Sequence, residues 1–131
     1  MISNGHNKTA AEKAWLFEVV SFAHDSDWLR DKYSHITAQY CPFQIDHILG
    51  AKTKRKIRGI SERVGELAIM PIPYELHVVD GSHPQNRTAR PGAYRKVFGH
   101  EKQVWLHMIR AMQEEGYEIP FSEMVIQAII R

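Results

Sequence analysis

The sequence predicts an α+β domain in which two short strands lie between helices at both ends of the chain. Apolar residues recur at helical spacing near both termini, whereas apolar and polar residues alternate in the middle. The chain has 131 residues, of which 44% are hydrophobic and 24% charged, and this fits one globular domain. We therefore expect a single domain over 1–131, made of a helical lead-in (1–40), a core (41–108) and a helical tail (109–131).

The lead-in is expected to contain two helices. Thr9 and Glu12 form the S/T-x-x-E pattern of a capping box, and apolar residues follow at broadly helical spacing, so we expect a helix over 10–23. Asp25-Ser26-Asp27 is typical of a turn and a helix cap. A second, shorter helix is expected over 28–36.

The core is expected to contain a pair of strands and a helix. Phe43 and Ile45 alternate with polar neighbours, which predicts a strand that ends at Asp46-His47. A second strand is expected over 67–70, and Pro71 is expected to end it. Pro73 suits the first turn of a helix over 74–79.

The tail is expected to be helical. Val104, Trp105 and Met108 follow helical spacing within a helix expected over 100–115, and Gly116 suits its C-terminal cap. Pro120 is expected to open a last helical segment.

The segment between the two expected strands is strongly basic. Over 52–63 its lysines and arginines are opposed only by Glu62, and Gly50 and Gly59 keep it from being helical. The net charge of +2 does not by itself establish a polyanionic partner, so the local clustering is the observation that points to nucleic acid. The candidate nucleic-acid-binding residues are Lys52, Lys54, Arg55, Lys56, Arg58, Asn86, Arg87 and Arg90.

The single cysteine, Cys41, excludes an intrachain disulfide and a four-cysteine zinc cluster. A reducing, cytoplasmic location fits this composition. No stretch of the sequence has the length and apolar character of a membrane span, so no membrane association is expected.

Residues that could ligate a metal or act as a base lie at and after the first expected strand. Asp46 and His47 end it, and His77 follows on the expected helix. A carboxylate is a hard ligand suited to Mg²⁺, and an imidazole can take a proton from water near neutral pH. His77 would add a second metal ligand from across the hairpin.

This pattern resembles the HNH, or His-Me finger, nucleases with their ββα-metal core. The resemblance lies in Asp46-His47, in the later AIMPIPYELH, and in VFGHEKQVW further along, and it covers about 41–108. It is strongest to small phage proteins of the recombination-enhancement-function kind. The resemblance implies a metal-dependent endonuclease that hydrolyses DNA in phage recombination or processing.

The roles implied by the resemblance are specific. His47 would be the general base that activates water, and Asp46 and His77 would ligate a divalent metal, with His83 as a further ligand from the following loop. The metal would neutralise the scissile phosphate and stabilise the leaving 3′ oxygen. Mg²⁺ is the first expectation because these residues do not make a closed zinc site, and Mn²⁺ or Zn²⁺ would also bind such ligands.

Two other functions stay open from the sequence. Ala68 stands where the family's asparagine orients the base histidine, and Gly81 stands where a second helix ligand is common, which favours a nucleic-acid-binding accessory protein that has lost the chemistry. The apolar helices at both ends and the modest net charge favour a helical protein-interaction domain.

Overall fold

The computed structural model describes residues 8–36, 42–50, 52, 54–78 and 82–131. Within these residues the chain forms helices and one two-stranded antiparallel sheet, so the α+β class is confirmed. Cys41 and Gly81, and Val79 at the end of an expected helix, lie outside the described residues. The elements in chain order are α1 (Ala10–Asp25), α2 (Trp28–Lys32), β1 (Phe43–His47), β2 (Ile69–Pro73), the 3-10 helix η2 (Tyr74–Leu76), α3 (Pro91–Phe98), α4 (Glu101–Glu114) and α5 (Glu123–Ile130).

Helix α1 begins with the capping box that the sequence predicts. The Glu12 backbone N–H donates to Thr9 Oγ1 at 3.1 Å, and the Thr9 N–H donates to Glu12 Oε1 at 2.9 Å. Glu12 also accepts two hydrogen bonds from Arg63, at 2.8 and 2.6 Å, so its carboxylate ties the start of α1 to the basic loop. The cap of α1 is thereby part of the tertiary structure.

Strand β2 contains both prolines that the sequence analysis places at a break, so that expectation is wrong. Pro71 pairs with Ile45 and Pro73 with Phe43 across the hairpin. Backbone hydrogen bonds flank the strands at Ile48 N–H to Ala68 O and Tyr74 N–H to Pro42 O, which assigns the ladder bonds to the alternate register positions. Both prolines therefore occupy positions whose N–H would point out of the ladder, where proline costs no hydrogen bond.

Three helix boundaries also differ from expectation. The helix expected over 74–79 is the single 3-10 turn η2, and α2 ends at Lys32 instead of residue 36. Helix α5 begins after Ser122, whose side chain accepts the Val125 N–H at 3.3 Å, and not at Pro120. The polar cap sets the start of α5, because a side-chain acceptor satisfies an otherwise unpaired helical N–H.

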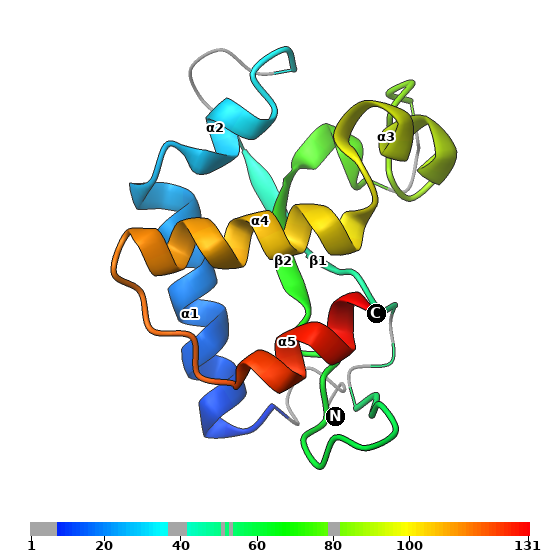
Figure 1. The fold of residues 1–131 in the computed structure, drawn as a ribbon. Coiled ribbons are helices and arrows are strands. Elements are labelled where there is room, and N and C mark those ends of the chain that lie inside the picture. Colours follow the sequence, from blue (N-terminus) through cyan, green and yellow to red (C-terminus); the bar gives the residue numbers. More distant parts are fainter. Residues whose placement is uncertain (1–7, 37–41, 51, 53, 79–81) are drawn as a thin grey trace, which may run out of the picture.

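The hairpin packs between helices that come from both ends of the chain. Helices α1 and α4 both pack on β2, all of whose residues are buried, and α4 also packs on α3 and α5 (Figure 1). Trp15 of α1 donates its indole N–H to the Leu67 carbonyl at 3.0 Å, just before β2. β1 is less covered than β2: Asp46 is buried, and the other four residues of β1 are partly exposed.

No helix in the described part of the chain is both long and apolar enough to cross a lipid bilayer.

The ion pair of Glu12 with Arg63 gives a test of pH-dependent stability. Burial alone would raise the pKa of Glu12, but the hydrogen bonds from Arg63 and Thr9 outweigh it and hold the pKa below its ordinary value. This stabilisation is present above the unfolded pKa of about 4.3 and is lost as the pH falls through the lower folded pKa. Glu12→Gln, which keeps an acceptor for Thr9, should lower the free energy of unfolding by about 1–3 kcal/mol at pH 7.

The measurement is urea unfolding at pH 7 and pH 3, with Glu62→Gln as the exposed control. The deficit of Glu12→Gln should shrink at pH 3. A deficit of the same size at both pH values would contradict the assignment.

Candidate functional site

Strand alternation and a short turn bring Asp46 and His77 together. Gln44 and Asp46 lie on the same face of β1, because side chains two residues apart in a strand point the same way. His77 follows η2 and contacts both: its Nδ1 lies 2.6 Å from Gln44 Oε1, and its Nε2 lies 3.6 Å from Asp46 Oδ1. The carboxylate and imidazole that the sequence singles out therefore meet, and Gln44 joins them.

The turn that carries His77 is held by the segment that follows it. Asn86 is fully buried, and its side-chain amide donates to the carbonyls of Glu75 and Val78 at 3.2 and 2.9 Å. The Thr88 hydroxyl donates to the His77 carbonyl at 3.1 Å. Asn86, expected to contact nucleic acid, is engaged within the protein and fixes the backbone around His77.

Arg87 is the partner of the buried carboxylate. Its Nη2 donates to Asp46 Oδ1 at 2.6 Å and its Nε donates to Asp46 Oδ2, while its Nη1 donates to Glu101 Oε2 at 2.7 Å. Arg95 donates to the same glutamate from outside, at 2.7 Å. Arg87, expected on a nucleic-acid-binding surface, instead bridges two carboxylates that are both about 3% exposed.

These contacts keep Asp46 ionised. Burial alone would raise its pKa, but the neighbouring His77 and the hydrogen bonds and charge of Arg87 outweigh burial and hold the pKa below its ordinary value. Glu101 follows the same pattern, because Arg95 and Arg87 offset the effect of burial on its pKa. Two negative charges and one guanidinium thus form a hydrogen-bonded cluster under η2.

His47 faces a second carboxylate on the opposite side of the strand. It follows Asp46 directly, so its side chain leaves β1 from the other face. Its Nε2 lies 2.8 Å from Oε1 of the buried Glu66, and its ring is 31% exposed. With Nε2 paired to Glu66, Nδ1 is the ring nitrogen left for other chemistry, since in the part of the chain that the structure describes it has no hydrogen-bond partner.

His83 lies apart from this pair. Its Nδ1 accepts the Gln85 backbone N–H at 3.0 Å, a local loop contact. The described residues contain no group of three or more His, Cys, Asp or Glu side chains placed to hold a metal ion. Among the described residues, Asp46 and His77 are therefore the carboxylate and imidazole that could hold a cation together, and His83 contacts neither.

The basic loop is exposed and ordered by the backbone. Lys56 and Arg63 form an isolated antiparallel bridge, and Gly59, with φ of 86°, turns the chain between them. The Val64 N–H donates to the Arg55 carbonyl at 2.7 Å. The exposed cations of this loop are Lys52, Lys54, Arg55, Lys56 and Arg58. Arg90 is also exposed, at the start of α3, and donates to the His83 carbonyl at 3.2 Å.

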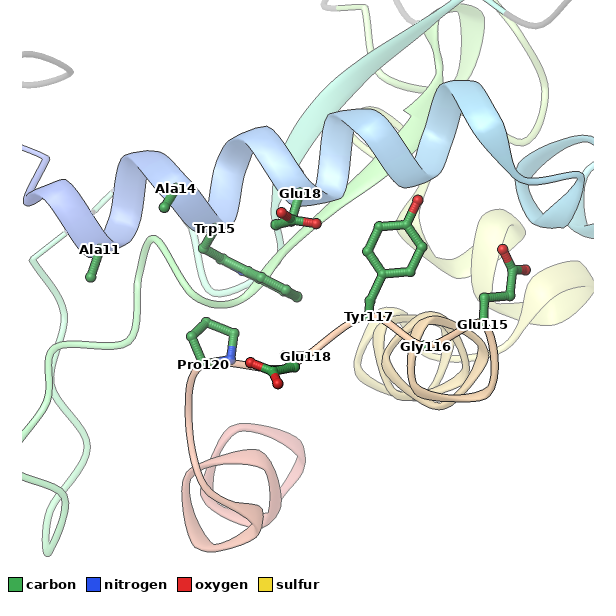
Figure 2. A pocket seen from close by; sticks show the side chains of 9 residues that line it. All are labelled: Ala11, Ala14, Trp15, Glu18, Glu115, Gly116, Tyr117, Glu118 and Pro120. Atoms are coloured by element: carbon green, nitrogen blue, oxygen red, sulfur yellow. The ribbon is translucent and has the colours of Figure 1, made fainter.

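A cavity of about 780 Å³ lies away from Asp46 and His77, between α1 and the segment that joins α4 to α5. Figure 2 shows Trp15 projecting from α1 towards this segment and Tyr117 rising from the segment towards α1. Its charged lining residues are all acidic: Glu18, Glu115 and Glu118. This cavity would repel a phosphate backbone, so it is separate in place and in charge from the site at β1.

Sequence reasoning missed Gln44, Glu66 and Glu101. Gln44 could have been found, because it precedes Asp46 by two residues on a strand and so shares its face. Glu66 and Glu101 reach the site from a loop and a helix. Glu101 lies within VFGHEKQVW, but that motif alone assigns it no contact with Arg87.

Comparisons of the chain with protein-family models, with curated proteins and with solved structures found no match.

The Arg87 cluster gives a stability test. In Arg87→Met, Asp46 and Glu101 would be left buried with reduced compensation, and breaking such a pair costs about 3–5 kcal/mol. Urea unfolding at pH 7 should show this loss. Arg110→Met, which breaks an exposed pair with Glu123, is the matched control and should cost less than about 1 kcal/mol. Equal, small losses in both variants would contradict the described network.

Proposed function

We propose that the protein is a metal-dependent endonuclease that hydrolyses DNA phosphodiester bonds, with a ββα-metal core formed by β1, β2 and η2. The observation that carries the proposal is the 3.6 Å approach of His77 Nε2 to Asp46 Oδ1, next to a half-exposed histidine that is paired with a carboxylate. The resemblance of the core sequence to the HNH nucleases adds the expected setting, phage DNA recombination or processing.

The donor set at Asp46 suits a divalent cation. Gln44 Oε1 is an acceptor, so Nδ1 of His77 donates to it, and in the neutral ring Nε2 then keeps its unshared electron pair. Metal-binding histidines are commonly oriented in this way by a hydrogen bond from their other ring nitrogen. Two ligands about 2.1 Å from one ion lie about 3–3.5 Å apart, close to the observed separation.

One carboxylate and one imidazole leave most of a coordination sphere to water and substrate oxygens, as is usual for Mg²⁺. Mn²⁺ would accept the same donors, and Zn²⁺ would find fewer protein ligands than it usually has. A bound ion would neutralise the scissile phosphate and the charge that develops on the leaving 3′ oxygen.

His47 is the proposed general base. Glu66 accepts a hydrogen bond from Nε2, which leaves Nδ1 to take a proton from the attacking water. Because His47 is the last residue of β1, a phosphodiester lying across the end of the strand would reach both His47 and the Asp46 face.

The basic loop is proposed to hold the DNA backbone. Its five exposed cations follow His47 in the chain by 5 to 11 residues and are Lys52, Lys54, Arg55, Lys56 and Arg58. A plot of the logarithm of the DNA-binding constant against the logarithm of the salt concentration has a negative slope. Each phosphate that these cations neutralise would make this slope steeper by about 0.9 on duplex DNA.

A second function is favoured by one contact. Arg87 donates to both oxygens of Asp46, and its positive charge opposes a dication on the same carboxylate. A nucleic-acid-binding accessory protein without catalysis would need no cation there. It predicts DNA binding with no metal uptake and no cleavage.

Metal binding separates the two functions without relying on activity. Calorimetric titration with Mn²⁺ should show one site in the native chain. His77→Ala and Gln44→Leu should weaken it by about tenfold or more, since a ligand and its orienting partner are lost. His107→Ala, on the exposed side of α4, is the control and should bind as the native chain does. An Mn²⁺ affinity that is the same in His77→Ala as in the native chain would exclude this site.

Cleavage tests the proposed base. Supercoiled plasmid and single-stranded DNA are incubated with Mg²⁺ or Mn²⁺ and each purified variant. His47→Ala should reduce the cutting rate by about 10²–10⁴-fold, because a general base is removed. The His107→Ala control should cut at the native rate. Equal rates for His47→Ala and the native chain would rule out His47 as the base.

A further inference from the structure

A small basic hollow lies beside the proposed site, at a place where three parts of the chain meet. It has a volume of about 260 Å³ and is lined by the residue after β1's turn, by the basic loop, and by the start of α4 and the end of α5. The lining residues are Leu49, Arg55, Lys56, Ile57, Lys102, Ala128, Ile129 and Arg131. Figure 1 shows the C-terminal end of α5 beside the chain that follows β1.

All polar side chains that line this hollow are cationic. Arg55 and Lys56 come from the basic loop, Lys102 from the first turn of α4, and Arg131 from the residue after α5. No aspartate or glutamate is among the lining residues. The acidic cavity of Figure 2 has the opposite composition, and a third hollow near Arg63 mixes both signs.

These cationic side chains have N–H donors that are not used in hydrogen bonds within the described residues. Arg55, Lys56 and Arg131 are exposed, and their side chains make no hydrogen bond or ion pair within the described residues. Lys102 donates one hydrogen bond to the Arg131 carbonyl at 2.9 Å, which leaves two of its three ammonium hydrogens. Within the described residues, an anion entering the hollow would therefore meet four cationic side chains, of which Lys102 already holds the Arg131 main-chain oxygen.

We infer that this hollow binds a backbone phosphate of the nucleic acid on which the protein acts, and that Lys102 and Arg131 are part of its binding surface. The inference rests on the proposed function and extends it from the basic loop to α4 and α5. A guanidinium offers the planar pair of donors that matches phosphate oxygens. The apolar floor of Leu49, Ile57 and Ile129 suits the sugar beside the phosphate.

The position of the hollow fits a substrate that continues past the proposed catalytic residues. Leu49 is two residues from His47, so their Cα atoms are at most about 7 Å apart. Successive nucleotides advance about 3.4 Å along a strand. The phosphate held here would thus lie within a few nucleotides of the one that is cut. The volume is below that of an ordinary small-molecule pocket, about 300–1,000 Å³, so a single phosphate and sugar fit better than a larger cofactor.

The test measures binding in the absence of metal, so that it does not depend on catalysis. Fluorescence anisotropy follows the full chain with a labelled duplex and a labelled single strand, in EDTA, from 50 to 200 mM salt. Lys102→Gln and Arg131→Gln are compared singly and together with the native chain. Lys32→Gln removes the same charge from α2, far from the hollow in Figure 1, and is the control.

The double substitution should lower the salt slope by about 1, because the one phosphate held in the hollow is lost, and each single substitution should lower the slope by part of that amount. At 0.1 M salt, a slope change of 1 corresponds to about tenfold weaker binding than in the native chain. Lys32→Gln should leave the slope unchanged. Unfolding curves in urea confirm that the variants are folded before they are compared.

Three outcomes would overturn the inference. Native slopes in both variants would remove Lys102 and Arg131 from the surface while leaving the proposed function in place. An equal loss in Lys32→Gln would assign the effect to net charge alone. Binding of inorganic phosphate that depends on these residues, combined with DNA binding that does not, would assign the hollow to a free anion. Absence of any DNA binding by the native chain would instead reject the proposed function itself.

Discussion

The structure depends on one buried guanidinium. Arg87 joins β1 through Asp46 and α4 through Glu101, and its own backbone N–H donates to the Leu76 carbonyl of η2 at 2.7 Å. Two carboxylates taken out of water need a compensating charge, and desolvation makes the loss of that charge costly. The same loop holds the turn that carries His77. The stability of the fold and the placement of the site therefore rest on the same set of contacts.

This arrangement also sets the limits of the chemistry. Asp46 is kept ionised by a cation of the protein itself, so it is ready to bind a second cation, yet the first cation opposes it. His47 is spared this conflict because it leaves the strand on the other side and pairs with Glu66. The endonuclease and the accessory protein differ in which effect prevails at Asp46: the attraction of a neutral imidazole and a carboxylate for a metal, or the repulsion from Arg87.

Local patterns were sufficient to predict much of the fold. The capping box of α1, the end of β1 at Asp46-His47 and the apolar repeat of α4 all appear where the sequence places them. The prolines of β2 were misread, because whether proline breaks a strand depends on the direction of each N–H in the ladder, and register is a property of the pair. The site divides in the same way: the end of the first strand pointed to Asp46 and His47 and the turn after the second strand to His77, whereas Glu66 and Glu101 reach them through tertiary packing.

The central claim is that the space between His77 and Asp46 is shaped for a metal ion. Long-range ¹H–¹⁵N correlation spectra of the labelled protein at pH 8 report which ring nitrogen of His77 carries the proton. Our account predicts a proton on Nδ1, held by Gln44, and an unprotonated Nε2 whose ¹⁵N resonance moves when diamagnetic Zn²⁺ is added. A proton on Nε2, with no change on adding Zn²⁺, would contradict it.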